Sequence, residues 1–469
     1  MIPSSTRFDQ STMQALLDAD PLVADYRQFF ALFDWSVVDH WQTQQSVYCG
    51  SHGHPLCAYL KAFLIRIKEG LSYSTRLRDF LLKHPLLVVE LGFELHLDPA
   101  APYGFDVDQT LPTRYWLGEK LRQLDHGLLS DLLAATVQAL QQEIPGLGET
   151  AAFDVKHIYA WVRENNPQVY VKGPFNVSYR CKGDPDCRLG VKKSSNQQSD
   201  EDSQQSAPDT SKTHRQQQPS TDSKSPSKSQ PKKKKVSLFG YGTGVAACTD
   251  PVYGDVVLAE YTLPFNEADV TYYRPLFQQT VLTLNQFPPF IAADAAYDFW
   301  YVYETVAHGP GIAAIPLNSH GHEAVPRDPD GTPYCWAGLR MHPTFQFRHT
   351  HGYRCLRFRC PLLFPERTGD YCDHQQFAKG KGCVKDINIE KGGLMRALLD
   401  RTSPLYHVIY QRRTACERIN SQAQALGIER PKVRNIRSVR NLNTLIYLVI
   451  NARVLAKATS INRGLLQMS

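Results

Sequence analysis

Three polar residues near the C-terminus have the spacing of one helix face. Tyr410, Arg413 and Glu417 follow one another at offsets of three and four residues, which places them on a single side of an α-helix. An ordinary amphipathic helix would carry leucine or valine at such positions. A phenol, a guanidinium and a carboxylate in a row instead predict a polar stripe.

Two acidic residues far upstream are the expected partners of Glu417. Asp154 follows the apolar run TAAF and Asp294 follows FIAA, so each is expected at the end of a buried strand. Strand ends of an α/β sheet face the crevice in which such folds bind substrates. Three carboxylates can hold two Mg²⁺ or Mn²⁺ ions about 4 Å apart for phosphodiester chemistry. Taken singly, each aspartate is equally explained as a turn or helix cap.

Hydrophobic periodicity predicts the elements that position these residues. The chain has 469 residues, 42% of them apolar, so two or three units with a sizeable core are expected. Residues 1–145 have helical spacing and form either a DNA-binding domain or a plain helical bundle. Short apolar strands alternate with helices over residues 149–191 and 237–317. The expected fold class is therefore α/β, a mixed sheet flanked by helices.

The remaining segments differ in composition. Residues 192–236 contain Ser, Gln, Lys, Pro and Asp with almost no apolar side chains, so a disordered polar insert is expected. Residues 318–395 are rich in His, Cys, Arg, Pro and Gly and are expected to form an inserted β or loop subdomain. Residues 396–469 are expected to be helical and to carry the polar stripe and a basic tail.

The positive charge of the chain is unevenly distributed. The formal net charge is +6, and between Arg412 and Arg440 eight Lys or Arg stand against two Glu. Such a local field suits nucleic acid, and a solvated helix face is the alternative. No apolar stretch approaches the ~20 residues needed to span a bilayer, and the N-terminus lacks a signal-peptide pattern. A cytoplasmic protein without a membrane partner is expected.

A segment rich in cysteine and histidine precedes the helical C-terminal part. A tetrahedral structural Zn²⁺ site, able to staple a loop-rich subdomain, has four candidate ligands, namely Cys360, Cys372, His374 and Cys383. Their spacing is not that of regular Cys-x-x-Cys pairs. Unligated thiols in a reducing cytosol are the alternative.

Several segments together resemble the DDE transposases of bacterial insertion sequences, of the type with a Tyr-Arg-Glu-Lys signature. FDVKHIYA resembles the strand of the first aspartate, AADAAYD the motif of the second, and YQRRTACERINSQAQ the signature. GDPDCRLGVKK followed by FGYGTGVAACTD resembles the family's Asp-Pro-Asp-Ala segment and the strand after it, and HPLCAYLKAFLIRIKEGLSYSTRLRDFLLKHPLL resembles the N-terminal helical domain. The resemblance covers nearly the whole chain except the polar insert.

The resemblance implies an RNase H-like catalytic domain, an N-terminal helical DNA-binding domain, and a Cys/His-rich insertion before the last catalytic helix. Asp154, Asp294 and Glu417 would bind Mg²⁺ or Mn²⁺ and catalyse cleavage at the element ends, followed by strand transfer into target DNA. The partners would be double-stranded DNA, as terminal inverted repeats and target, and a second copy of the chain in a homodimer on DNA. The location would be the bacterial cytoplasm, in association with the nucleoid.

The resemblance also implies roles for residues around the stripe. Arg413 would clamp a phosphate near the cleaved end, and Tyr410 would bond a phosphate or stack near an extruded base. The DNA backbone would be followed by basic side chains that include Arg418, Arg434 and Arg437.

One signature position departs from the family pattern, because Gln424 stands where the family has lysine. That lysine contacts DNA and is not a metal ligand, so weaker binding of the ends is expected before any loss of chemistry. Two other functions fit the same sequence: a related nuclease without strand transfer, and a non-catalytic, decayed DNA-binding copy. Joined products would separate a transposase from a nuclease, and binding without cleavage in any metal would identify a decayed copy.

Overall fold

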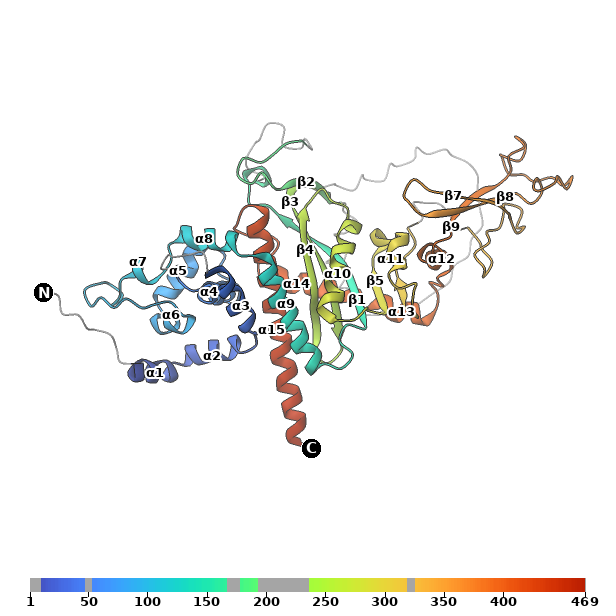
Figure 1. Ribbon diagram of the computed structural model, residues 1–469. Coiled ribbons are helices and arrows are strands. Elements are labelled where there is room, and N and C mark those ends of the chain that lie inside the picture. The colour runs from blue at the N-terminus through green and yellow to red at the C-terminus, as the bar shows by residue number, and fades with distance from the viewer. Residues whose placement is uncertain (1–9, 47–52, 167–177, 193–235, 319–324, 469) are drawn as a thin grey trace, which may run out of the picture.

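The computed structural model describes residues 10–46, 53–166, 178–192, 236–318 and 325–468. N-terminal helices lie to one side of a central sheet, and a smaller sheet lies on the opposite side (Figure 1). The fold is mixed α/β, as the alternation of strands and helices predicts. Parallel and antiparallel strands share the central sheet.

The N-terminal part of the chain is helical, as its apolar spacing predicts. Its helices are α1 Gln10–Ala19, α2 Pro21–Phe30, α3 Ser36–Ser46, α4 Leu56–Lys68, α5 Ser74–Leu82, α6 Pro85–Leu91, α7 Val107–Thr110, α8 Arg114–Gln123 and α9 His126–Glu143. The helix α4 is buried along most of its length and packs against α3, α5 and α6. The helix α9 packs against a strand of the central sheet and against the long C-terminal helix. The helical part therefore shares its core with the sheet.

The central sheet is built from six strands. They are β1 Thr150–Tyr159, β2 Arg188–Lys192, β3 Val236–Asp250, β4 Gly254–Pro264, β5 Phe290–Ala293 and β6 Ile312–Ala314. The strand β3 pairs antiparallel with β1 on one edge and with β4 and β2 on the other. Beyond β1, the strands β5 and β6 continue the sheet in parallel. The hairpin turn between β3 and β4 falls at residues 251–253.

The side chains of β1 and β5 alternate between two cores. Ala152 and Ala292 belong to the core under the C-terminal helices, whereas Phe153 and Ala293 belong to the core under α10 (Tyr273–Leu284). Because strand side chains alternate with a period of two, Asp154 and Asp294 are assigned to the first of these faces.

The expected disordered insert lies outside the described residues, apart from its two ends. Residues 193–235 are not described. Lys192 and Val236, which the sequence assigns to the insert, are instead strand residues that pair with each other across β2 and β3. They form strand because β3 extends past its last pair with β4, Tyr241 with Pro264, and its backbone offers hydrogen-bonding groups there.

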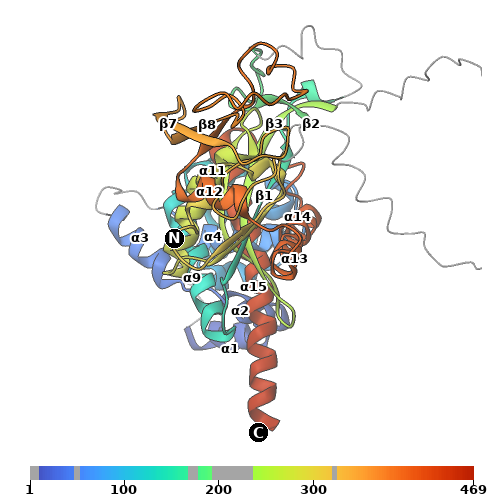
Figure 2. The ribbon, with the colours of Figure 1, turned by 90° about the vertical axis from the view of Figure 1, so that its right-hand side faces the viewer.

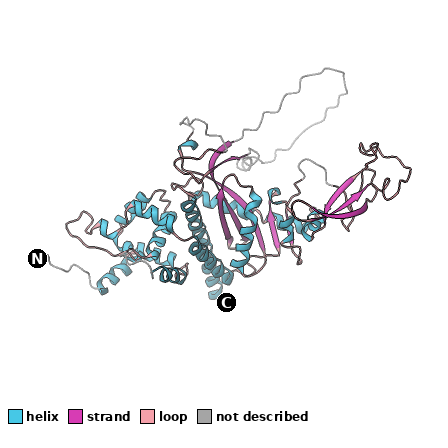
Figure 3. Ribbon diagram, turned by 45° about the horizontal axis from the view of Figure 1, so that its top comes forward, coloured by secondary structure: helices cyan, strands magenta, loops and turns pink. Residues whose placement is uncertain are grey.

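The inserted subdomain, for which the sequence leaves a β or a loop structure open, contains a second sheet (Figure 3). Its strands are β7 His342–Arg348, β8 Arg354–Arg359 and β9 Val384–Asn388, all antiparallel. It is joined to the central sheet through α11 Trp300–Glu304 and α12 Lys391–Leu398, which pack together. That packing requires Gly392, because a Cβ there would lie 2.3 Å from the backbone oxygen of Trp300.

The C-terminal part contains α13 Pro404–Gln411, α14 Thr414–Ala425 and α15 Ile436–Met468. The helices α13 and α14 lie beside each other against the sheet (Figure 2). The expectation that no segment is long and apolar enough to span a membrane is wrong for α15. Residues 436–466 meet both criteria, yet 67% of the most apolar stretch is buried within the fold. Since α9 and β4 cover it, the burial favours a core helix, and polar Asn443 and Asn451 bond to neighbouring elements from it.

Candidate active site

The parallel pairing of β1 with β5 brings Asp154 and Asp294 side by side. Phe153 is in register with Ala293, so the next residue on each strand is an aspartate. The sequence predicts Asp154 at the end of its strand, and this is wrong. Asp154 lies in the middle of β1, because β1 continues to Tyr159 where β5 has stopped. Asp294 directly follows β5 and also caps a short turn, accepting a 2.9 Å hydrogen bond from the Ala296 N–H.

The helix α14 lies over these aspartates. The Asn420 side-chain amide donates a 3.0 Å hydrogen bond to Asp154 Oδ2, and Glu417 lies three residues earlier on the same helix face. The Glu417 carboxylate is half exposed and forms a 2.8 Å ion pair with Arg413. Within the described ranges, no group of three or more His, Cys, Asp or Glu side chains is arranged to hold a metal ion as it stands.

The polar stripe is present but does not lie on one continuous helix. The helix breaks at Arg412 and Arg413, where backbone N–H groups bond three residues back, and Arg413 caps α14. The expectation of a single helix is therefore wrong. The three side chains still adjoin, because the Arg413 guanidinium lies over the Tyr410 ring at 5.6 Å and also pairs with Glu417.

The carboxylates are held in a poorly solvated position. Burial, together with the smaller effect of the Asp294 charge, raises the pKa of Asp154 to about 7, against the opposing effects of a Val155 backbone hydrogen bond and the Arg413 charge. Burial also raises the pKa of Asp294. Close carboxylates in a low dielectric resist ionisation together, and such perturbed groups concentrate at functional sites.

A third aspartate, which the sequence analysis missed, lies close to the pair. Asp269 begins a short 3₁₀ turn, Asp269–Tyr272, before α10. Burial and then the Asp294 charge raise its pKa to about 6. The Tyr297 hydroxyl is buried without a hydrogen-bond partner. Burial and then the charges of all three aspartates raise its pKa. No motif marks Asp269, since only the tertiary packing of the turn against β1 brings it to the site.

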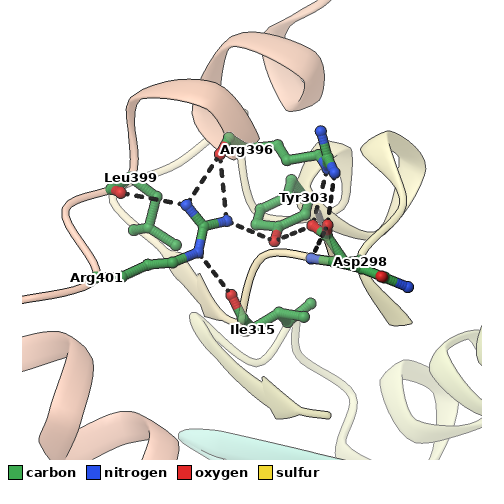
Figure 4. Close-up of polar contacts among 7 residues, drawn as sticks. Asp298, Tyr303, Ile315, Arg396, Leu399 and Arg401 are labelled. Carbon is green, nitrogen blue, oxygen red and sulfur yellow. Dashed lines mark hydrogen bonds and ion pairs between the residues drawn. The ribbon is translucent and has the colours of Figure 1, made fainter. Parts of the chain in front are cut away.

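A buried ionic network holds the chain that leads into α13 against the strand ends (Figure 4). Asp298, whose side chain is fully buried, accepts hydrogen bonds from Arg396 Nε at 2.8 Å and from the Tyr303 hydroxyl at 2.7 Å. Arg401 donates to the Tyr303 hydroxyl at 3.0 Å and to the Ile315 carbonyl after β6 at 2.9 Å. The network thus ties α11, α12 and the strand ends together ahead of the helix that carries Glu417.

Basic and aromatic side chains follow β1 away from the aspartates. The Lys156 ammonium donates to Gln424 Oε1 at 3.1 Å, so a cation adjoins the position where the family has lysine. The guanidinium of Arg430 lies 4.6 Å from the Tyr159 ring, and that of Arg434 lies 4.8 Å from the Trp161 ring. Gln424, Arg434 and Arg437 are all exposed. Lys156 is mostly buried and pairs with Glu429 at 3.4 Å, so we call only Arg430, Lys432 and Arg434 the β1 basic surface.

Arg418 is engaged in the fold. Its guanidinium forms two hydrogen bonds, of 2.7 and 2.6 Å, with the Asp255 carboxylate on β4, and a third of 3.0 Å with Thr249. The sequence predicts a side chain that follows DNA. In the structure this guanidinium instead fixes α14 to the β3–β4 hairpin.

The predicted zinc ligands are only partly brought together. Cys360, Cys372 and Cys383 lie in one small core of the inserted subdomain, which also contains Cys335. His374 is not in that core; its ring lies 6.2 Å from the Trp336 ring, and its Nδ1 is buried without a partner. Cys335 is not among the predicted ligands, because it lies 25 residues before Cys360, outside the segment from Cys360 to Cys383 that contains the other candidates.

No family model matches the sequence, and no match is found among curated proteins.

Proposed function

We propose that this chain is a DDE-type transposase that cuts duplex DNA at the ends of an insertion sequence and joins the freed 3′ ends to target DNA. The observation that carries the proposal is the adjacency of Asp154 and Asp294 on paired parallel strands, under a helix that bonds to Asp154 and carries Glu417. Two strand-borne carboxylates with a helix-borne third are the arrangement that the resemblance implies.

The fold supports the same proposal. An RNase H-like domain is expected to be a mixed sheet flanked by helices. Here three antiparallel strands, β4, β3 and β1, are continued by the parallel strands β5 and β6, and helices cover both faces. The first aspartate lies on β1 and the second follows the strand beside it.

The donor set fits a hard divalent cation. Asp154 and Asp294 supply carboxylate oxygens, and Asp269 adds a third negative group nearby. A buried and unpartnered Asn420 Oδ1 also lies at the site. Burial raises the pKa of both carboxyls although the Arg413 charge opposes it, so this one cation does not fully compensate their charges. Bound Mg²⁺ or Mn²⁺ would supply a Lewis acid that activates water or a 3′-hydroxyl and stabilises the leaving oxygen.

The chain's own residues would orient the DNA. Arg413 is half-buried between Glu417 and the aspartates, and its Nε lacks a partner, so its planar fork can accept a phosphate. A phosphate bound there would release Glu417 from the ion pair and free the carboxylate for the metal. Asn420 would keep Asp154 oriented throughout.

The β1 basic surface would follow the DNA backbone beside the site. Replacement of Arg434 by Gln is expected to weaken binding of all duplex sequences alike. The slope of log K against log salt should become shallower by about 0.9, because one phosphate contact no longer releases a counterion. Fluorescence anisotropy over a salt series measures this. Arg453→Gln is the matched control, since Arg453 is exposed on α15, about 24 Å along that helix from Arg437. Equal slopes in the two variants would contradict a DNA path along β1.

The proposal as a whole is tested by cleavage of a labelled duplex that carries the element's own end. Wild type should cut in Mg²⁺ or Mn²⁺ and not in chelator, and joined products should appear when target DNA is added. Glu417→Gln is expected to lower the rate by about 10²-fold, a loss of on the order of 3 kcal/mol of transition-state stabilisation, while leaving DNA affinity nearly unchanged.

The other outcomes each have a distinct meaning. Cleavage without joined products would indicate a nuclease. Specific binding without cleavage in any metal, unchanged in Glu417→Gln, would indicate a non-catalytic DNA-binding protein and overturn the proposal.

A further inference from the structure

The inserted subdomain has a small hydrophobic core, which buries little apolar surface with which to stabilise its folded structure. Its buried side chains are four hydrophobic residues, Met341, Phe358, Leu362 and Ile387, and four cysteines. Three short strands and long loops surround them. Units with so little buried apolar surface are commonly stapled by disulfides or a structural metal.

The four cysteines come from distant points of the chain and share one small core, in which the metal-free side chains are not arranged as a ready metal site. The Trp336 N–H, next to Cys335, donates to Cys383 Sγ at 3.4 Å. A Cβ placed on Gly382 would lie 2.6 Å from Cys360 Cβ and 3.2 Å from its Sγ, so Cys360 packs directly on the backbone before Cys383. Cys372 completes the cluster, since it is buried in the same small core as Cys335, Cys360 and Cys383.

The backbone turns tightly at two of these cysteines, Cys335 and Cys360. Cys335 donates its N–H to the Leu339 carbonyl at 2.8 Å and accepts from the Gly338 N–H at 3.0 Å. Gly338 has a φ of +72°, a left-handed conformation that suits glycine. The Cys360 carbonyl accepts from the N–H groups of Leu363 and Phe364 at 3.1 and 3.0 Å.

We propose that one structural Zn²⁺ ion is bound in the inserted subdomain by four thiolates, those of Cys335, Cys360, Cys372 and Cys383. Four soft sulfur ligands in a closed, buried site suit tetrahedral zinc. Binding displaces the thiol protons, and the Trp336 N–H donates to one of the resulting thiolates. The site carries a net charge of −2, and its surroundings are basic, with ten Lys or Arg against five Asp or Glu over residues 335–391.

The proposal replaces His374 by Cys335 in the ligand set predicted from sequence. All four cysteines are free thiols here, so their sulfurs remain available as ligands. The metal would hold the 335–340 loop against β8 and the loop before β9, and it is independent of the Mg²⁺ chemistry at Asp154.

The full chain, purified without chelator, should contain about one zinc per chain by metal analysis. Cys335→Ser is expected to lose the zinc, whereas His374→Ala retains it. Cys355→Ser is the matched control, because Cys355 is buried on β8 in the same subdomain but lies outside the cluster. Retention of zinc in Cys335→Ser with loss in His374→Ala would overturn the proposed ligand set.

A second measurement needs no variant and is therefore unaffected if Cys335→Ser fails to fold. X-ray absorption at the zinc edge of wild type should show four sulfur neighbours at about 2.3 Å. A nitrogen or oxygen in the first shell, no zinc after reconstitution, or two disulfides in the purified protein would each overturn the site. DNA cleavage is not a readout here, so failure of this proposal leaves the transposase proposal standing.

Discussion

Asp154→Asn is expected to lower metal-dependent DNA cleavage by at least about 10³-fold, as loss of a group central to the reaction does. The amide keeps the size and the contact with Asn420 but removes the charge that holds a divalent cation. The same substitution should stabilise the metal-free protein above pH 7. An active-site residue that destabilises the fold would thus be identified by opposite effects on activity and stability.

The sign of the stability effect follows from the raised pKa. The Asp154 carboxyl has a pKa of about 7 in the folded chain, against an ordinary value of 3.8. The folded state therefore retains a proton that the unfolded state releases between these values, which favours folding at low pH. This contribution is present below about pH 4 and is lost as the pH rises through 7. The gain from Asp154→Asn should grow over the same interval to on the order of 2–4 kcal/mol.

Urea denaturation at pH 4.5, 6 and 8 in chelator measures this effect. Asp370→Asn is the control, because Asp370 is an exposed carboxylate of the inserted subdomain. Added Mg²⁺ should stabilise wild type at pH 8 and not Asp154→Asn, since a ligand stabilises only the state that binds it. Wild-type cleavage by Asp154→Asn would exclude the site. A variant less stable than wild type at pH 8 would show that burial of the charge is not costly there.

Local patterns predicted the elements well and the site in part. The apolar runs before Asp154 and Asp294 correctly indicated β1 and β5, because buried strands require continuous apolar residues. Adjacency of the two aspartates was expected from chemistry, but the register Phe153 to Ala293 that produces it is a tertiary fact.

Other features depend on contacts that no local pattern records. Asp269 reaches the site through packing of a 3₁₀ turn, and Arg418 is captured by Asp255 from a hairpin 163 residues away in sequence. The break between α13 and α14 is not predicted by residue spacing, because Arg412 and Arg413, which lie at the break, both have helical φ and ψ. Spacing therefore identified charged residues but not which charges the fold itself neutralises.

Asp298→Ala is expected to destabilise the protein by on the order of 3–5 kcal/mol, the loss typical when one partner of a buried ion pair is removed. Asp298 accepts from both Arg396 nitrogens, at 2.8 and 2.5 Å, and from the Asn318 N–H at 2.8 Å. Removal leaves the Arg396 charge and this N–H without their acceptor. The Tyr303 hydroxyl still accepts from Arg401 but also loses the acceptor of its own proton.

A matched control separates burial from ion pairing as such. Asp386 accepts two hydrogen bonds from Arg357, at 2.8 and 2.9 Å, and both side chains are about one-third exposed. Asp386→Ala should therefore cost no more than about 1 kcal/mol. If Asp298→Ala costs no more than Asp386→Ala in urea denaturation, the network of Figure 4 is not a structural anchor.

The double variant Asp298→Leu/Arg396→Met gives the sharper test. It removes both charges at once, so no uncompensated charge remains, and it should be more stable than Asp298→Ala by a measurable coupling energy. Its DNA cleavage should nevertheless stay low. The double variant lacks the directional bonds that join Asp298, after β5, to Arg396 on α12. The segment leading to α13 and α14 is therefore less well fixed, and Glu417 is no longer held over the aspartates. Recovery of stability without recovery of cleavage would assign Asp298 a positioning role; recovery of both would leave it a purely structural one.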